Sequence, residues 1–159
     1  MNTCSKCAQN VHIAYTLSIY NDENQPNKGI IMIYTITTKQ PIETIKSELE
    51  AKAKAVGFGV LNTYEFKKIL ESKGFPIEKD ITVFELCNPP GAQQALTDIA
   101  AISVYLPCRV SLYEENGVST LSTIGFEEIL GAVEVDDNFK AFMSILFENL
   151  KRVMHSWDN

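Results

Sequence analysis

Phe84-Glu85-Leu86-Cys87-Asn88-Pro89-Pro90-Gly91 is the stretch that indicates the fold, because it predicts a strand that turns directly into a helix. Asn88 can accept a hydrogen bond from an amide of the first helical turn, and the proline after it keeps Asn88 out of the helical region. Pro89 suits the first helical position, where its missing N–H costs nothing. The Cys87 thiol would then lie just outside a helix N-terminus, where the helix dipole favours the thiolate.

A second stretch, Leu106-Pro107-Cys108-Arg109-Val110, predicts the start of another strand. Consecutive strands are neighbours in a sheet about two times in three, so we expect the two thiols of Cys87 and Cys108 near one rim. A disulfide would need their Cα atoms within roughly 7 Å. Strand alternation points Arg109 away from Cys108. Buried cysteines that pack as small apolar side chains are the other interpretation, and free cysteine is among the most buried residue types.

The patterns before this region predict three strands and two helices, one of the strands being a short apolar one that follows the turn at Gly57 and ends near Leu61. Alternation of period two predicts a half-buried strand over Val11–Tyr20, and β-branched residues predict its hairpin partner over Ile30–Thr38. Apolar residues at spacings of three and four predict a helix between Pro41 and Gly57. Asn62 with Glu65 resembles a capping pair that would open the second helix. We expect that helix to turn its apolar side chains inward, namely Phe66, Ile69 and Leu70.

The patterns after this region predict a hairpin and a long last helix. Asn116-Gly117 between two apolar runs is the strongest short-range hairpin signal. Asp136 or Asp137 can cap a helix whose apolar stripe extends from Phe139 to Trp157. Such a stripe suits the core or a subunit interface. Together these elements predict an α+β fold in two layers, with helices packed on one mixed, mostly antiparallel sheet, an extra N-terminal strand and a long C-terminal helix.

Composition and charge narrow the classes of function. A chain of 159 residues predicts one domain, which we place at residues 11–159 behind a flexible tail at residues 1–10. Twenty acidic against fourteen basic side chains give a net charge of −6, which argues against nucleic acid as a partner. No apolar run reaches the roughly 18–20 residues that cross a bilayer, and no secretory signal opens the sequence. We therefore expect a cytoplasmic protein that does not bind membranes.

Chemistry-bearing residues are few. Cys4 and Cys7 form a lone C-x-x-C motif, which supplies two soft ligands where a closed zinc site needs four, so they are weak candidates for half a metal site. No cofactor is predicted. Serines lack a nucleophile elbow, and both histidines lie near the ends of the chain, so no catalytic constellation is recognised. Glu85, in an otherwise apolar strand, is either desolvated or, as we expect, solvated or paired.

The motifs closely resemble those of the domain-of-unknown-function family 302. The resemblance rests on Gly57-Phe58-Gly59-Val60, on Cys87-Asn88-Pro89-Pro90 and on Leu106-Pro107-Cys108-Arg109-Val110, and it covers roughly Ile30 to Gly125. It implies a compact α+β domain, with helices on a mostly antiparallel sheet, that forms a dimer. It implies no established activity.

Two functional hypotheses follow. The first is a non-catalytic domain of a cytoplasmic homodimer that binds a small ligand or a partner segment, with an anionic ligand group favoured by the helix N-terminus. The second is a thiol-based redox, sulfur-carrier or metal-binding protein that uses Cys87 and Cys108. A purely structural dimer is a third reading. The candidate ligand-binding residues are Cys87, Asn88, Pro89, Pro90, Cys108 and Arg109.

Overall fold

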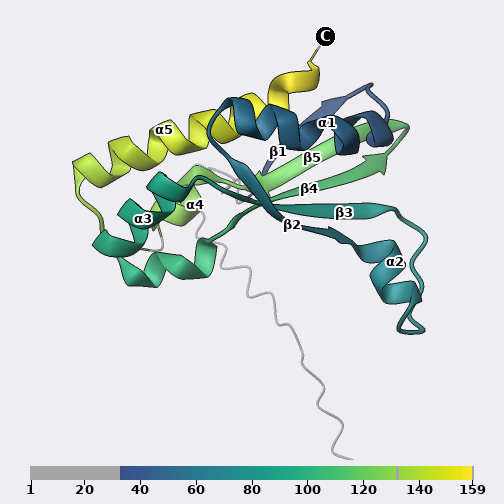
Figure 1. The fold of residues 1–159 in the computed structure, drawn as a ribbon, viewed down its shortest axis with the longest axis horizontal. Coiled ribbons are helices and arrows are strands. Elements are labelled where there is room, and N and C mark those ends of the chain that lie inside the picture. The colour runs from purple at the N-terminus through teal and green to yellow at the C-terminus, as the bar shows by residue number, and fades with distance from the viewer. Residues whose placement is uncertain (1–32, 132, 159) are drawn as a thin grey trace, which may run out of the picture.

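The computed structural model describes residues 33–131 and 133–158, which form a five-stranded sheet covered by helices (Figure 1). The strands are β1 (Ile33–Thr38), β2 (Gly59–Glu65), β3 (Ile81–Cys87), β4 (Cys108–Glu115) and β5 (Val118–Ile124). Their order across the sheet is β1-β5-β4-β3-β2, and every pairing is antiparallel. The expected α+β class is confirmed, with an entirely antiparallel sheet in the described part of the chain.

The helices gather mainly on one face of the sheet and at one of its ends. They are α1 (Ile42–Ala55), α2 (Phe66–Glu71), α3 (Pro89–Asp98), α4 (Phe126–Gly131) and α5 (Asp137–Met154), with 3-10 turns η1 (Ala100–Tyr105) and η2 (His155–Trp157). In Figure 1, α1 and α5 lie across the sheet, α3 lies beside the first half of α5, and α2 projects at the opposite end of the molecule.

Two apolar clusters hold these layers together. The main core joins α1 and α5 to alternate residues of the central strands, and its members include Leu49, Phe84, Val110, Leu121 and Val153, all buried. A second cluster lies where α3, η1 and α4 meet the start of α5, around Ala95, Ile102, Phe139 and Met143. The α5 stripe is therefore used by both clusters, and its expected role in the core is confirmed.

The local signals around the hairpin and the long helix act as predicted. Asn116 and Gly117 have φ angles of 53° and 77°, which gives the turn between β4 and β5 the twist that a two-residue hairpin requires. Asp136 caps α5, because its side chain accepts a hydrogen bond from the Phe139 amide at 2.8 Å. Of the two aspartates that could cap, Asp136 does so.

Two expectations about the first half of the chain are wrong. Asn62 and Glu65 do not cap a helix, since both belong to β2, which pairs with β3 and shifts register between Val60 and Asn62. The short helix α2 begins only at Phe66 and has no buried side chain, so its apolar residues do not face a core. Pairing with β3 outweighs the local capping signal.

The expected hairpin between Val11–Tyr20 and Ile30–Thr38 is described only in part. Within the described residues, β1 pairs along its full length with β5, from Ile33 opposite Ile124 to Thr38 opposite Ser119. The predicted strand at 11–20, like the tail at 1–10, lies outside the described residues. The division into tail and single domain stays a prediction.

Candidate functional site

Asn88 joins the turn after β3 to the turn before β2. Its Oδ1 accepts a hydrogen bond from the Gly91 amide at 2.8 Å, which caps α3 as predicted. Its Nδ2 donates to the Gly57 carbonyl oxygen at 2.9 Å. Gly57 has a φ of +84°, and a Cβ there would lie 3.0 Å from Asn88 Nδ2, so glycine suits the position both for its backbone and for the close approach. One side chain thus fixes two loops.

The two core cysteines lie on adjacent strands as reduced thiols. Leu86 is paired with Cys108 across β3 and β4, and Cys87 is paired with Gly59 across β3 and β2. Both cysteines are free and partly buried. Burial, with a smaller contribution from Cys87, raises the pKa of the Cys108 thiol to about 11. Cys108 is therefore protonated at neutral pH, which suits packing better than nucleophilic chemistry.

The three motif stretches meet around one small apolar cavity of about 40 Å³. Its walls include Phe58, Leu86, Cys87, Asn88, Gly91, Leu106 and Cys108. This convergence gives the quoted motifs a shared structural role, because residues 30 and 50 positions apart in the chain pack on one another. The cavity is near the volume of a single water molecule, about 30 Å³, and is too small for an organic ligand.

The polar contacts of Arg109 are with residues outside this cluster. Its Nε donates to Glu85 Oε1 at 3.2 Å, and Tyr64 donates its hydroxyl proton to Glu85 Oε2 at 3.1 Å. Glu85 and Arg109 face each other on β3 and β4, and Arg109 is 65% exposed. The expected pairing of Glu85 is confirmed. Arg109 therefore carries a cross-strand ion pair, and its charge is already engaged.

A much larger groove, of about 760 Å³, lies between α3 and the beginning of α5. Asn88, Pro90 and Gly91 form one end of it, so the predicted site residues reach it from α3, where Pro89 is the first residue. The opposite wall comes from the segment before α5 and its first turns. This wall is lined by Glu134, Val135, Asp136, Asn138, Phe139 and Phe142.

The groove is acidic. Three carboxylates line it, on Asp98, Glu134 and Asp136, together with the amides of Asn88, Gln94 and Asn138, and no lysine, arginine or histidine is among its described walls. Asp136 is partly engaged by its capping bond, and Asp98 accepts a hydrogen bond from Gln94 at 2.7 Å. Two phenylalanines, Phe139 and Phe142, supply an apolar floor. The groove suits a ligand that has an apolar part and a positively charged group.

Close packing sets the inner end of the groove. A Cβ at Gly91 would lie 2.6 Å from Leu146 Cδ1 and 2.9 Å from Asn88 Oδ1, so a larger residue there would require these two side chains to shift. Sequence reasoning found the α3 side of the groove through the Asn-Pro motif. It missed the α5 side, because nothing in the sequence indicates that Glu134 and Phe142 face α3.

The weakest site prediction cannot be placed. Cys4 and Cys7 lie outside the described residues. Across residues 33–131 and 133–158, no three His, Cys, Asp or Glu side chains are grouped as metal ligands would be. Within the same residues no helix has the length and apolar character needed to cross a membrane.

The fold and its motifs define a class of small α+β domains, in which a sheet carries its helices on one face and a cysteine-asparagine-proline turn begins a helix. The model of the family described as Domain of unknown function DUF302 matches residues 34–157, and this chain belongs to that family. A crystal structure of an uncharacterised conserved DUF302 protein from Bacillus stearothermophilus is similar, with a TM-score of 0.66 and 26% sequence identity. The match covers 80% of this chain and 97% of that one. No curated protein matches this chain.

Proposed function

We propose that this protein is a non-catalytic binding domain whose site is the groove between α3 and α5, where it takes a small ligand or a segment of a partner. The observation that supports this most is the groove itself, about 760 Å³ against the motif residues Asn88, Pro90 and Gly91. Its volume falls in the range of about 300–1,000 Å³ that ligand sites occupy. Apolar and polar side chains both line it, as in typical ligand sites.

Charge refines the class of ligand. The sequence favoured an anionic ligand, because a helix N-terminus attracts negative charge. The carboxylates of Asp98, Glu134 and Asp136 outweigh that attraction, since each is a full negative charge and the dipole is worth about half of one. A ligand with an apolar body and a positive group is therefore the better match.

The setting in which this domain acts is part of the proposal. We infer a homodimer in the cytoplasm. We do not expect nucleic acid or a membrane as partner, because the net charge of −6 repels anionic polymers and surfaces. The long stripe of α5 is already used within one chain, so the dimer needs another surface.

The thiol hypothesis is the second candidate. It is supported by two free cysteines on neighbouring strands, which share one apolar cavity. Against it stands the raised pKa of Cys108, which leaves too little thiolate at neutral pH for thiol exchange. Site-by-site alkylation, with metal content measured on the same sample, separates the two hypotheses. If Cys87 and Cys108 react only after the protein unfolds and no metal is found, an accessible dithiol is contradicted and the binding proposal is unaffected.

A pair of probes with opposite charge tests the binding proposal. Phenylethylamine and 3-phenylpropanoate share an aromatic body and differ in the sign of their charge. We expect phenylethylamine to shift the amide resonances of Gly91, Gln94 and Glu134 in a ¹⁵N-resolved titration and 3-phenylpropanoate to shift them far less. Glu134→Gln should weaken the response to the amine. Absence of groove shifts with either probe, at any protein concentration, would contradict the proposal.

A further inference from the structure

The end of the molecule opposite the groove carries an arm, residues 66–79, made of α2 and the loop that leads to β3. Figure 1 shows α2 projecting beyond the body of the sheet, with α3 and the start of α5 at the other end of the long axis. No side chain of α2 is buried. A helix of six residues is far below the length at which isolated helices are stable in water. Two apolar side chains of the arm, Phe66 and Phe75, are exposed in a single copy of the chain.

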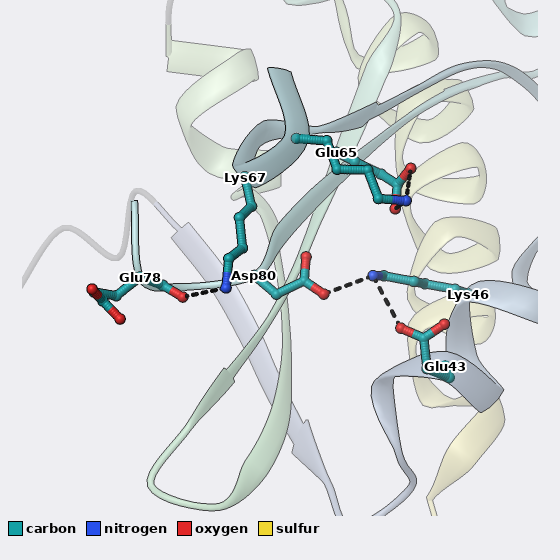
Figure 2. A network of polar contacts seen from close by, with 7 residues as sticks. Glu43, Lys46, Glu65, Lys67, Glu78 and Asp80 are labelled. Carbon is teal, nitrogen blue, oxygen red and sulfur yellow. Dashed lines mark hydrogen bonds and ion pairs between the residues drawn. The ribbon is translucent and has the colours of Figure 1, made fainter. Parts of the chain in front are cut away.

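The arm has a defined shape, which makes it a candidate to dock. The Phe75 amide donates to the Leu70 carbonyl at 2.9 Å, and Gly74 with a φ of +82° closes the end of α2. At its base, Lys67 Nζ donates to the Glu78 carbonyl at 3.2 Å, and Asp80 forms an ion pair with Lys46 of α1 at 3.0 Å, as Figure 2 shows. These polar contacts order the backbone, while Phe66 and Phe75 stay exposed and Ile69, Leu70 and Ile77 are partly buried.

Apolar and basic groups lie together on the arm. Phe75 is 73% exposed and Phe66 is 37% exposed. Within residues 66–79, four lysines outnumber two glutamates. Lys68 and Lys79 are paired with Glu65 and Glu115. Among the described residues, Lys67 and Lys73 have no carboxylate partner and are exposed.

We propose that the arm of one copy, led by Phe75, Lys67 and Lys73, occupies the groove between α3 and α5 of a second copy. This inference rests on the proposed function, since it names the partner segment that the groove takes. The groove supplies carboxylates and a phenylalanine floor, and the arm supplies free cations and an exposed phenylalanine. Among the described residues, the carboxylates that line the groove have no cation beside them in the wall, and Lys67 and Lys73 of the arm have no carboxylate partner.

Symmetry permits both contacts at once. The arm and the elements that line the groove, α3 and the start of α5, lie at opposite ends of the long axis (Figure 1), so a two-fold axis across it brings the arm end of each copy to the groove end of the other. Such a two-fold contact closes on itself and gives a dimer, where a single contact repeated head to tail would give a chain of copies.

Charge reversal on each side tests this docking by mass. Lys67→Glu with Lys73→Glu makes the arm negative, and Asp98→Lys with Glu134→Lys makes the groove positive. We expect the unchanged full-length chain to sediment at twice its 17.8 kDa, and each double variant at 17.8 kDa. An equal mixture of the two double variants should recover the dimer, because both of its contacts then join opposite charges.

A matched control and the probe titration separate the outcomes. Lys52→Glu with Lys54→Glu on α1 changes the net charge equally, and should leave the dimer intact. The docking would be overturned if the unchanged chain is a monomer. It would also be overturned if the variant Lys67→Glu with Lys73→Glu is still a dimer. Double variants that stay monomeric on mixing, while each keeps its circular dichroism spectrum, would overturn it too. If the docking is overturned but phenylethylamine still shifts the groove resonances, the groove is a binding site that does not take the arm. If phenylethylamine shifts no groove resonance either, both the docking and the binding proposal fail.

Discussion

Asn88 donates a hydrogen bond to the carbonyl of Gly57, 31 residues earlier in the chain, with the side-chain atom that its capping role leaves free. Asn88→Ala removes this bond and the cap of α3 together. We expect the free energy of unfolding to fall by about 1–3 kcal/mol, the sum of a lost cap and a lost hydrogen bond. Urea unfolding at neutral pH measures the loss.

Asn88→Asp is the matched control for this prediction. The carboxylate still accepts from the Gly91 amide, and a negative charge is favoured at a helix N-terminus. It cannot donate to Gly57, so we expect a loss of about 1 kcal/mol, smaller than that of alanine. An Asn88→Asp variant as stable as the unchanged chain would show that the bond to Gly57 contributes nothing, and equal losses for the two variants would show the same of the cap.

Gly91→Ala should separate α3 from α5. The added Cβ would lie 2.6 Å from Leu146 Cδ1, so the Leu146 side chain would have to shift. We expect a loss of about 1–3 kcal/mol in the free energy of unfolding, typical of overpacking. The second change Leu146→Ala removes the clashing methyl groups, so the double variant should lose less than the sum of the single changes. Additive losses would contradict the packing described for the groove.

Cys108 makes stability depend on pH above neutrality. Burial raises its pKa from 9.0 to about 11, so the unfolded chain releases this proton before the folded chain does. The contribution of Cys108 is therefore complete below pH 9 and is lost as the pH rises towards 11, by roughly 2–3 kcal/mol at 1.36 kcal/mol per unit. Unfolding curves from pH 7 to 11 should decline more steeply for the unchanged chain than for Cys108→Ala. Parallel curves, or rapid alkylation of folded Cys108 at pH 8, would refute its burial.

The pair formed by Glu85 and Arg109 should matter little. Arg109 is 65% exposed and the Glu85 side chain 13% exposed. Glu85 keeps the hydrogen bond from the Tyr64 hydroxyl when Arg109 is replaced, so we place the contribution of the ion pair at about 0–1 kcal/mol, the value for exposed pairs. We expect Arg109→Gln to change stability within that range and to leave the dimer and the groove titration unaltered. A large loss of probe binding in Arg109→Gln would instead return this residue to the site, as the sequence pattern first suggested.

The elements with strong local signals could be predicted from the sequence. Asn88 before Pro89 fixes the start of α3, and Asn116-Gly117 fixes the β4–β5 turn, because in each case two adjacent residues restrict the backbone. The capping pattern of Asn62 and Glu65 gave the wrong element. Its local energy is about 1 kcal/mol, and cross-strand pairing of the whole of β2 exceeds it.

The candidate site could be predicted only on one side. The Asn-Pro motif indicates where α3 begins, but the groove also needs Glu134 and Phe142, some fifty residues later, and the packing of α3 on α5 brings them there. The arm could not be predicted at all. Its apolar residues look like a core stripe in the sequence, and their exposure follows from where the ends of β2 and β3 lie, beyond the reach of α1 and α5.

The most direct test of the central claim is an isotope-filtered NOE experiment on the dimer formed from one ¹³C-labelled and one unlabelled copy. It detects only contacts between copies. The account predicts cross-peaks between the ring protons of Phe75 in one copy and the methyl groups of Val135 in the other, and their loss in the variant Lys67→Glu with Lys73→Glu. Intermolecular cross-peaks that involve other surfaces, with none between the arm and the groove, would contradict it.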